Sequence, residues 1–325
     1  MRTIRWGILS TGTIAKNFAE TAKKMADVKI TAVASRSQKK ADDFGWKYGI
    51  AHCYDSYEAL AKDPDVDIVY VATPHSRHFD DVKLMIENGK HVLCEKSFTV
   101  DAKEAEMLFA LAKEKGVFLM EAFWTKLCPI YRDVERIIAS GALGEIRTVT
   151  AQYGYTTARE ARKFDPALAG GTLLDIGVYA IGFACMMLGY EMDEIRSKLV
   201  MNSVGTDAYD AIYMRKGDAF AQLTCAIGAY MPLHGAVYGT KGYIDIPEFK
   251  NPQKITVFYE GRSPQVFTRV FEVNGFEYEI REAMDCVRAG RTESSLMTPE
   301  QSIAVMRIMD EIRAQNGMRF PFEQA

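Results

Sequence analysis

The sequence predicts an α/β domain with a parallel sheet, followed by an α+β domain with a mostly antiparallel sheet. Residues 1–124 alternate short apolar runs with helical patterns, as in a parallel sheet wrapped by helices. After about residue 123 the pattern changes to β-rich segments separated by turn residues. The length of 325 residues also favours two domains. We therefore expect a first domain at residues 1–124 and a second domain at residues 125–325.

The elements of the first domain follow from apolar runs and from the residues that end them. Short apolar runs predict buried strands, and longer stretches with helical spacing predict helices. Gly89 and Gly116 are expected just after two helices, because glycine readily adopts the left-handed conformation at a helix C-terminus. The expected strands are residues 4–9, 28–34, 67–72, 92–93 and 117–120, and the expected helices are residues 12–25, 37–48, 78–87 and 101–115.

The second domain begins with an expected helix at residues 131–139 and continues as a series of strands. Turn sequences such as residues 216–218 separate these strands. A last helix is expected after Thr298, which suits an N-cap and precedes Pro299 at the first helical position. The expected strands are residues 146–155, 198–202, 208–214, 219–227, 233–238, 243–246, 255–259 and 268–273, and residues 170–188 are expected to form a loop that enters a helix.

Composition and charge exclude several classes of protein. The net charge of −3 and the pI near 6.0 give no basic footprint, so we expect no nucleic-acid partner. The N-terminus lacks the apolar run of a signal peptide, and we expect no membrane-spanning segment. The six cysteines are scattered without a Cys-x-x-Cys pair, which argues against a zinc site. We therefore expect no metal centre, reduced thiols and a cytoplasmic location.

The turn after the first strand resembles a dinucleotide-binding fingerprint. Its three small-residue positions fall on Ser10, Gly12 and Ala15. Gly12 suits close approach of the backbone to a pyrophosphate, and the following helix N-terminus offers amide donors. Ser10 replaces the usual first glycine, and a strand–helix turn without a ligand is the alternative interpretation. The expected dinucleotide contacts are Ser10, Thr11, Gly12, Thr13 and Ile14.

The end of the second strand favours NADP over NAD. An NAD site usually places Asp or Glu here to bind the ribose 2′-hydroxyl. This chain instead has Ser35 and Arg36, with no acidic residue before Asp42. The forked guanidinium of Arg36 suits a 2′-phosphate, which a carboxylate would repel. The alternative is that Arg36 simply begins a solvated helix.

The segment from Gly89 to Lys96 predicts a short strand that ends in the pair Glu95-Lys96. In an open α/β sheet, ligands bind outside the carboxyl ends of the strands. A lysine at that position can reach a substrate, and neighbouring groups can shift its pKa. Taken alone, an ordinary solvated charge pair is the simpler interpretation.

Four segments together resemble the glucose–fructose oxidoreductase / inositol dehydrogenase (Gfo/Idh/MocA) family. They are the early glycine loop and residues 71–78, 89–96 and 170–179. Within this family the chain resembles the dimeric dihydrodiol dehydrogenases and the NADP-dependent D-xylose dehydrogenases, on residues 5–10 and 119–125 and on Tyr179. The resemblance implies a Rossmann fold, then an open-faced, mostly antiparallel sheet that pairs between subunits. A homodimer or higher homo-oligomer is therefore expected.

The same resemblance implies roles for individual residues. It places the catalytic lysine at Lys96, an aspartate at Asp175 and the acid/base residue at Tyr179. Ser97 stands where the family usually has proline after the Glu-Lys pair. The residues expected beside the cofactor also include Thr73, Pro74, His75, His78 and Glu95.

Oxidation of an alcohol needs a hydride acceptor and a base. A tyrosine has a reference pKa near 10, so Tyr179 needs a nearby cation such as Lys96 to favour its phenolate. Asp175 lies one helical turn earlier and would orient the substrate or Lys96. Trp124, Tyr155 and Phe164 are candidates for an aromatic wall against the substrate, although such residues more often belong to the core.

We therefore predict an oxidoreductase that transfers a hydride between NADP, or less favourably NAD, and a hydroxyl or carbonyl of a sugar, polyol or cyclic diol. It would work as a dehydrogenase or in the reductive direction, or keep its cofactor bound in a redox-neutral reaction. The alternative from another class is a non-catalytic NAD(P)-sensing regulator of the same fold.

Overall fold

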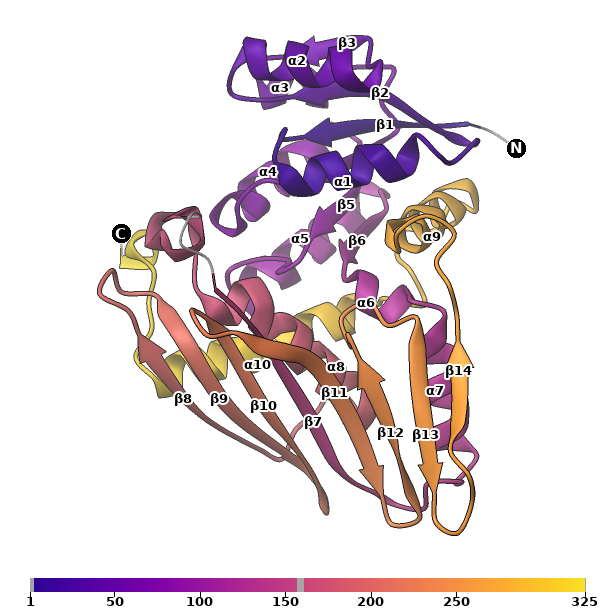
Figure 1. Cartoon of the computed structure of the whole chain (residues 1–325). Coiled ribbons are helices and arrows are strands. Elements are labelled where there is room, and N and C mark those ends of the chain that lie inside the picture. The colour runs from indigo at the N-terminus through magenta and orange to yellow at the C-terminus, as the bar shows by residue number, and fades with distance from the viewer. Residues whose placement is uncertain (1–2, 157–160, 325) are drawn as a thin grey trace. The chain divides into compact units, whose positions relative to one another are not determined.

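The computed structural model describes residues 3–156 and 161–324 and divides into two compact units (Figure 1). The first unit is Met1–Trp124 with Glu272–Ile303, and the second is Thr125–Phe271 with Ala304–Ala325. Residues 272–303 thus differ from the expected division, because the chain returns to the first unit there. Contacts that hold the returning segment include Thr21 Oγ1 to Asn274 Oδ1 at 2.8 Å, Leu119 N to Thr292 O at 3.1 Å, and Arg288 Nη2 to Asp27 Oδ2 at 2.9 Å.

Among the described residues, the sheet of the first unit has six strands in the order β3-β2-β1-β4-β5-β6, all parallel. The strand order reverses between β1 and β4, which is where a doubly wound sheet binds its ligand. The strands are β1 (Ile4–Leu9), β2 (Val28–Ala34), β3 (His52–Tyr54), β4 (Ile68–Val71), β5 (His91–Glu95) and β6 (Leu119–Ala122). The helices are α1 (Thr13–Ala22), α2 (Gln38–Tyr48), α3 (Tyr57–Ala61), α4 (His75–Glu87), α5 (Ala102–Lys115) and α9 (Phe276–Arg288).

The strands at the centre of this sheet are apolar because helices cover both of its faces. Phe18 of α1 lies between Trp6 and Tyr70, with ring centroids 5.1 and 4.0 Å away. Helix α4 begins at His75, three residues earlier than expected, because Pro74 occupies its N-cap. The short elements β3 and α3 escaped the sequence prediction, since three and five residues give too little periodicity.

The described part of the second unit contains an eight-stranded sheet in the order β14-β13-β12-β11-β7-β10-β9-β8. Neighbours are antiparallel except β7 and β10, which run parallel. The strands are β7 (Ile146–Tyr155), β8 (Glu194–Met201), β9 (Asp207–Lys216), β10 (Ala219–Ile227), β11 (Met231–Gly239), β12 (Gly242–Pro247), β13 (Lys254–Tyr259) and β14 (Gln265–Thr268). The helical segments are α6 (Trp124–Leu127), α7 (Ile130–Ala139), η1 (Ala161–Phe164), η2 (Pro166–Leu168), η3 (Leu173–Gly177), α8 (Val178–Leu188), α10 (Pro299–Gln315) and η4 (Pro321–Gln324). Residue 124 of α6 and residues 299–303 of α10 belong to the first unit.

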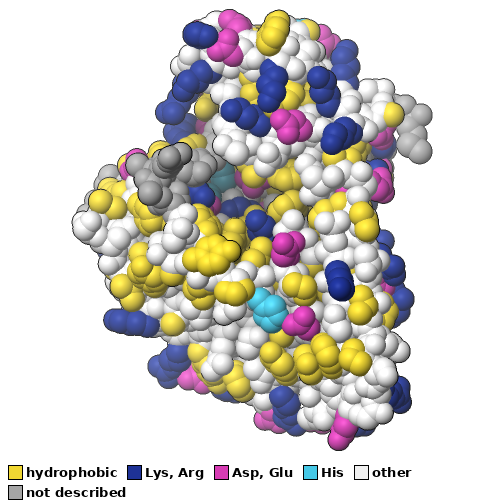
Figure 2. All heavy atoms as spheres, in the orientation of Figure 1, with side chains coloured by type: hydrophobic (Ala, Val, Ile, Leu, Met, Phe, Trp, Pro, Cys, Tyr) yellow, Lys and Arg dark blue, Asp and Glu magenta, His cyan; other side chains and the backbone are white. Residues whose placement is uncertain are grey.

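One face of this sheet is covered and the other is open. Helix α8 packs against β7 and β10 and is apolar on nearly all sides, as expected of a core helix. Figure 2 shows hydrophobic side chains gathered over the surface of the second unit. Exposed residues of the strands include Val200, Tyr209, Tyr238, Tyr243 and Val266.

One segment of the second unit, Pro166–Leu188, is long and apolar enough to cross a membrane by length and composition. Length and composition do not by themselves make this segment a membrane span, because a buried core helix passes the same test. Its most apolar window is 83% buried inside the structure, as in the core helix of a soluble protein.

Candidate active site

The turn between β1 and α1 has the shape that a dinucleotide fingerprint requires. Ser10 has φ of 99°, a left-handed conformation that normally favours glycine. Its Oγ accepts the Gly12 amide at 3.3 Å, which holds the turn. Gly12 is the N-cap of α1 and no side chain caps the helix there, so amide donors at this end are available to an anion. A Cβ on Gly12 would meet only Ser10 Oγ, at 3.5 Å. The chain itself therefore does not demand glycine here.

The residues after β2 lie where the sequence predicted. Ser35 is buried and its amide donates to Tyr54 O at 3.0 Å. Arg36 is exposed and forms no ion pair within the described part of the chain. The guanidinium is near enough to Tyr57 to lower the pKa of that phenol, although burial of Tyr57 raises it more. Arg36 is thus a cation at the carboxyl end of β2, as a 2′-phosphate site would need.

His78 has a different environment from the one expected of a cofactor contact. It is fully buried, with Nε2 2.8 Å from Thr73 O and Nδ1 2.9 Å from Ser97 O. Burial lowers the pKa of His78, and the carbonyl oxygens at both ring nitrogens act in the opposite direction. Its side chain therefore joins the turn after β4 to the turn after β5, and its contact with the cofactor stays a prediction.

Lys96 follows the last residue of β5 and is half-buried, next to the fully buried Ser97. The peptide bond between these two residues is cis. Glu95 is buried and accepts a hydrogen bond from the Tyr70 hydroxyl. The carboxylate therefore faces the interior of the unit, where it is anchored by a tyrosine of β4.

Two further carboxyls of the first unit are completely buried near the Glu95-Lys96 pair. Burial, and secondarily Glu95, raise the pKa of Glu121 to about 7, while Lys96 opposes this rise. Burial also raises the pKa of Glu279 on α9 well above its usual range, with Glu95 adding to the effect. Neither residue could be predicted from the sequence, because nothing in their local pattern distinguishes a buried glutamate from a surface one.

In the second unit, Asp175 belongs to a three-residue polar cluster. The Tyr155 hydroxyl donates to Asp175 Oδ2 at 2.7 Å and accepts from Lys163 Nζ at 2.6 Å. Lys163 Nζ also lies 3.6 Å from Asp175 Oδ2. Tyr155 was expected to offer an aromatic wall, and the structure adds a polar role for its hydroxyl. Lys163 was not foreseen, since it lies in a short helical turn without a motif.

Tyr179 lies in the first turn of α8 and is 7% exposed. Lys250 Nζ is 5.6 Å from its ring centroid and 3.5 Å from the Tyr153 hydroxyl. Burial raises the pKa of Tyr153 to about 12, so that phenol stays neutral. Asp175 lies within the π-helical turn η3 and Tyr179 in the helix that follows, so the α-helical spacing used to predict a shared face does not strictly apply.

The remaining aromatic candidates occupy ordinary packing positions. Trp124 belongs to the first unit, where its ring packs against Phe276 at a centroid distance of 4.9 Å. Phe164 belongs to the second unit, is half-buried and accepts at its carbonyl from Thr206 Oγ1 at 3.4 Å. Their contact with substrate stays a prediction.

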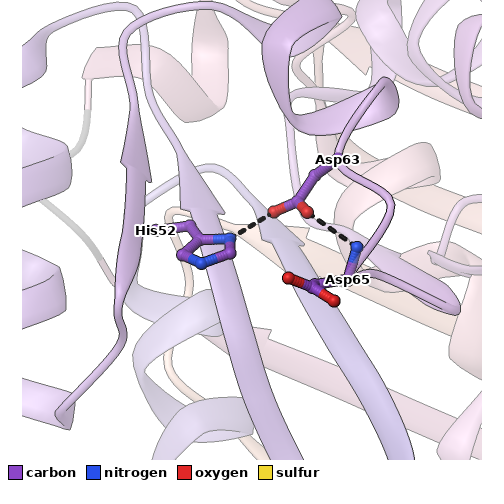
Figure 3. A group of neighbouring side chains, drawn as sticks. All are labelled: His52, Asp63 and Asp65. Carbon is purple, nitrogen blue, oxygen red and sulfur yellow. Dashed lines mark hydrogen bonds and ion pairs between the residues drawn. The ribbon is translucent and has the colours of Figure 1, made fainter.

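A cluster in the first unit has the composition of a metal site (Figure 3). His52, Asp63 and Asp65 each offer a ligand atom, all within 4.8 Å of one another. Partners within the chain already engage them: His52 Nδ1 lies 2.7 Å from Asp63 Oδ2, and the Asp65 amide donates to Asp63 Oδ1 at 2.8 Å. Arg5 pairs with Asp65 at 2.7 Å. We interpret this cluster as a structural link between β3 and the loop after α3.

Comparison with known families agrees with both units. Residues 4–123 match the oxidoreductase family with an NAD-binding Rossmann fold, and residues 131–245 match the GFO/IDH/MocA C-terminal domain. The chain belongs to the Gfo/Idh/MocA oxidoreductase family. This membership confirms the expected Rossmann fold and the mostly antiparallel second sheet.

Individual relatives extend over the whole chain. Trans-1,2-dihydrobenzene-1,2-diol dehydrogenase from Xenopus tropicalis is 34% identical over 327 residues, covering 98% of this chain and 99% of that protein. The Mus musculus enzyme of the same name is 34% identical and covers 98% of both chains. The crystal structure of the 3-ketoreductase KijD10 from Actinomadura kijaniata, with NADP and TDP-benzene, has a TM-score of 0.89 at 27% identity, covering 96% and 98% of the two chains.

Proposed function

We propose that this protein is an NADP-dependent dehydrogenase acting on a CH–OH group of a sugar, a polyol or a cyclic diol. The observation that carries the proposal is the full-length similarity to dihydrodiol dehydrogenases, at 34% identity over 98% of the chain. The solved 3-ketoreductase with NADP supports the cofactor and adds carbonyl reduction as the reverse direction.

The first unit offers a site that fits NADP. The uncapped start of α1 and the small Gly12 suit a pyrophosphate, and the exposed Arg36 suits a 2′-phosphate. We assign the rest of the contact surface to Ser10, Thr11, Thr13, Ile14, Ser35, Thr73, Pro74, His75, Glu95 and Lys96. When bound, the cofactor supplies the hydride acceptor.

The proton chemistry is assigned to Tyr179. A buried phenol is a poor base unless a cation favours its phenolate. Lys250 is a cation that lies beside the Tyr179 ring within the second unit, and the family motif suggests Lys96 as a second cation. Asp175, oriented by Tyr155 and Lys163, would accept a hydrogen bond from a substrate hydroxyl and so fix the position of the substrate.

We also propose that two copies of the chain pair through the open face of the second sheet. Tyr243 stacks between Tyr238 and Phe258, at 5.6 and 4.5 Å between ring centroids, and Tyr238 and Tyr243 are partly exposed. Such a row of aromatic side chains suits a self-complementary interface. Sedimentation of Tyr243→Asp should show a smaller species than the wild type, whereas an unchanged size would contradict the pairing.

A cytoplasmic location is proposed on the state of the thiols. All six cysteines are free, and five of them are buried. Free thiols are typical of proteins kept in a reducing compartment.

The activity is tested by supplying NADP⁺ with a panel of aldoses, inositols and trans-cyclic diols, and NADPH with the matching ketones. We expect one class to give turnover with the wild type and none with Lys96→Ala. Tight NADP binding without turnover on the whole panel would contradict the enzyme and favour the NAD(P)-sensing alternative.

A further inference from the structure

Strand β9 carries two carboxyl groups into the interior of the second unit. Asp207 and Asp210 are 0% and 1% exposed. Charged groups that are buried together need partners or must take up a proton, because two adjacent carboxylates repel each other in a medium of low polarity. Neither residue belongs to the proposed active site, and the carboxyls of both lie close to η3 or its start.

Asp207 holds the first residue of η3. Its Oδ2 accepts the Leu173 amide at 2.5 Å. Gly171 has φ of +131°, and a Cβ there would lie 2.0 Å from Asp207 Oδ1. The glycine is therefore required both by its backbone conformation and by the close approach of this carboxyl. Thr172, which lies between Gly171 and Leu173 in the chain, donates its hydroxyl to Ala208 O at 2.9 Å and accepts from the Ile227 amide at 3.2 Å.

Asp210 lies at the other end of η3. A Cβ on Gly177, the last residue of η3, would lie 3.6 Å from Asp210 Oδ2. On the neighbouring strand β10, Cys225 is the register partner of Asp210. The two aspartates thus support the beginning and the end of the segment that contains Asp175 and runs directly into Tyr179.

The charge state of the pair follows from what surrounds it. Among the described residues, Asp207 Oδ1 and both oxygens of Asp210 have no hydrogen-bond donor. Among the described residues, the titratable groups beside Asp210 include Asp207 from its own strand and its register partner Cys225 on β10, and neither is a cation. Burial and Asp207 raise the pKa of Asp210 well above its usual range, and burial raises the pKa of the Cys225 thiol, so both stay neutral.

We infer that Asp207 and Asp210 share one proton, and that this carboxyl–carboxylate pair positions the turn carrying Asp175 and Tyr179. The proton on Asp210 donates to Asp207, and the single remaining charge faces the Leu173 amide at the start of the helical segment. Both aspartates are positioning residues, acting through the backbone of residues 171–177. The link to catalysis rests on the proposed function, whereas the shared proton does not.

The shared proton is tested on the full-length chain by comparing Asp210→Asn with wild type. Asparagine keeps a donor toward Asp207 and cannot ionise. Because the folded protein holds a proton that the unfolded chain releases, the folding constant of the wild type should fall about tenfold per pH unit relative to Asp210→Asn, from about pH 5 up to the folded pKa. The infrared spectrum at neutral pH should also lose one protonated-carboxyl band in the variant.

The control is Asp218→Asn, whose side chain is 88% exposed at the turn after β9. Its stability should follow the wild type at every pH. Parallel stability curves for Asp210→Asn and wild type, with no lost carboxyl band, would overturn the shared proton whatever the activity.

The positioning role is tested by kinetics. Asp210→Asn should keep kcat within about twofold, while Asp207→Leu, which removes the acceptor for the Leu173 amide, should lower kcat about tenfold or more with the Kd for NADP unchanged. If Asp207→Leu fails to fold, Asp210→Leu serves, with the same loss expected. Wild-type kcat in a folded leucine variant, or an equal loss in Asp210→Asn, would overturn this role. If no substrate is found, the infrared and stability measurements still decide whether Asp207 and Asp210 share a proton.

Discussion

The two compact units hold their candidate site residues by different means. In the first unit these residues follow the ends of β1, β2, β4 and β5, so each belongs to a short local segment. In the second unit Asp175 is held by Tyr155, 20 positions away, and the turn before it by Asp207, 34 positions from Leu173. A parallel sheet brings strand ends to one edge by topology. The second site instead depends on particular long-range side-chain contacts.

The largest effect on kcat is expected from a substitution that disables the site of the first unit and leaves its fold intact. Lys96→Ala should lower kcat by about 10³-fold or more, because it removes the ammonium that assists proton transfer. The Kd for NADP should change little, as fluorescence titration would show. Lys113→Ala, on the exposed face of α5, is the matched control. Near-normal turnover by Lys96→Ala would refute the assignment.

The buried carboxyl of Glu121, near Lys96 in the first unit, should make the free energy of unfolding depend on pH. Its pKa is raised to about 7, so its neutral form favours folding at low pH and this advantage is lost as the pH rises toward 7. Relative to Glu121→Gln, the wild type should lose up to about 3 kcal/mol between about pH 4.5 and about pH 7. Urea denaturation across this range measures the difference. A constant difference would mean that Glu121 does not titrate there.

Arg36 tests whether one exposed side chain sets the choice of cofactor. Arg36→Asp should lower the ratio of kcat/KM for NADP over NAD by roughly 30-fold, because a charge-assisted contact worth about 2 kcal/mol is replaced by repulsion. Lys39→Asp, which removes an exposed positive charge from α2, is the control. The same preference in Arg36→Asp and wild type would exclude a 2′-phosphate contact.

The smallest effect is expected in the polar cluster of the second unit. Lys163→Met should lower kcat/KM about tenfold, since Tyr155 and Asp175 lose their shared cation but keep their mutual hydrogen bond. NADP binding should be unchanged in equilibrium titration. If the Kd for NADP rose and kcat did not fall, Lys163 would belong to the cofactor site.

More of the first unit than of the second could be predicted from the sequence. Ser10, Arg36 and Lys96 could be proposed as site residues because strand ends and local motifs are visible in a linear sequence. Lys163, Asp207 and Glu121 were missed because their importance comes from burial and from partners distant in sequence. The capping of α10 was confirmed, with the Thr298 amide donating to Gln301 at 3.1 Å, since that signal also lies within four residues.

The return of residues 272–303 to the first unit sets a limit on folding during synthesis. Helix α9 supplies Glu279 and the Arg288–Asp27 ion pair, so the N-terminal unit is incomplete until the ribosome has passed residue 303. The intervening strands of the second unit emerge first. A nascent chain stopped at residue 124 should therefore be protease-sensitive, because residues 272–303 complete the first unit and residues 304–325 complete the second.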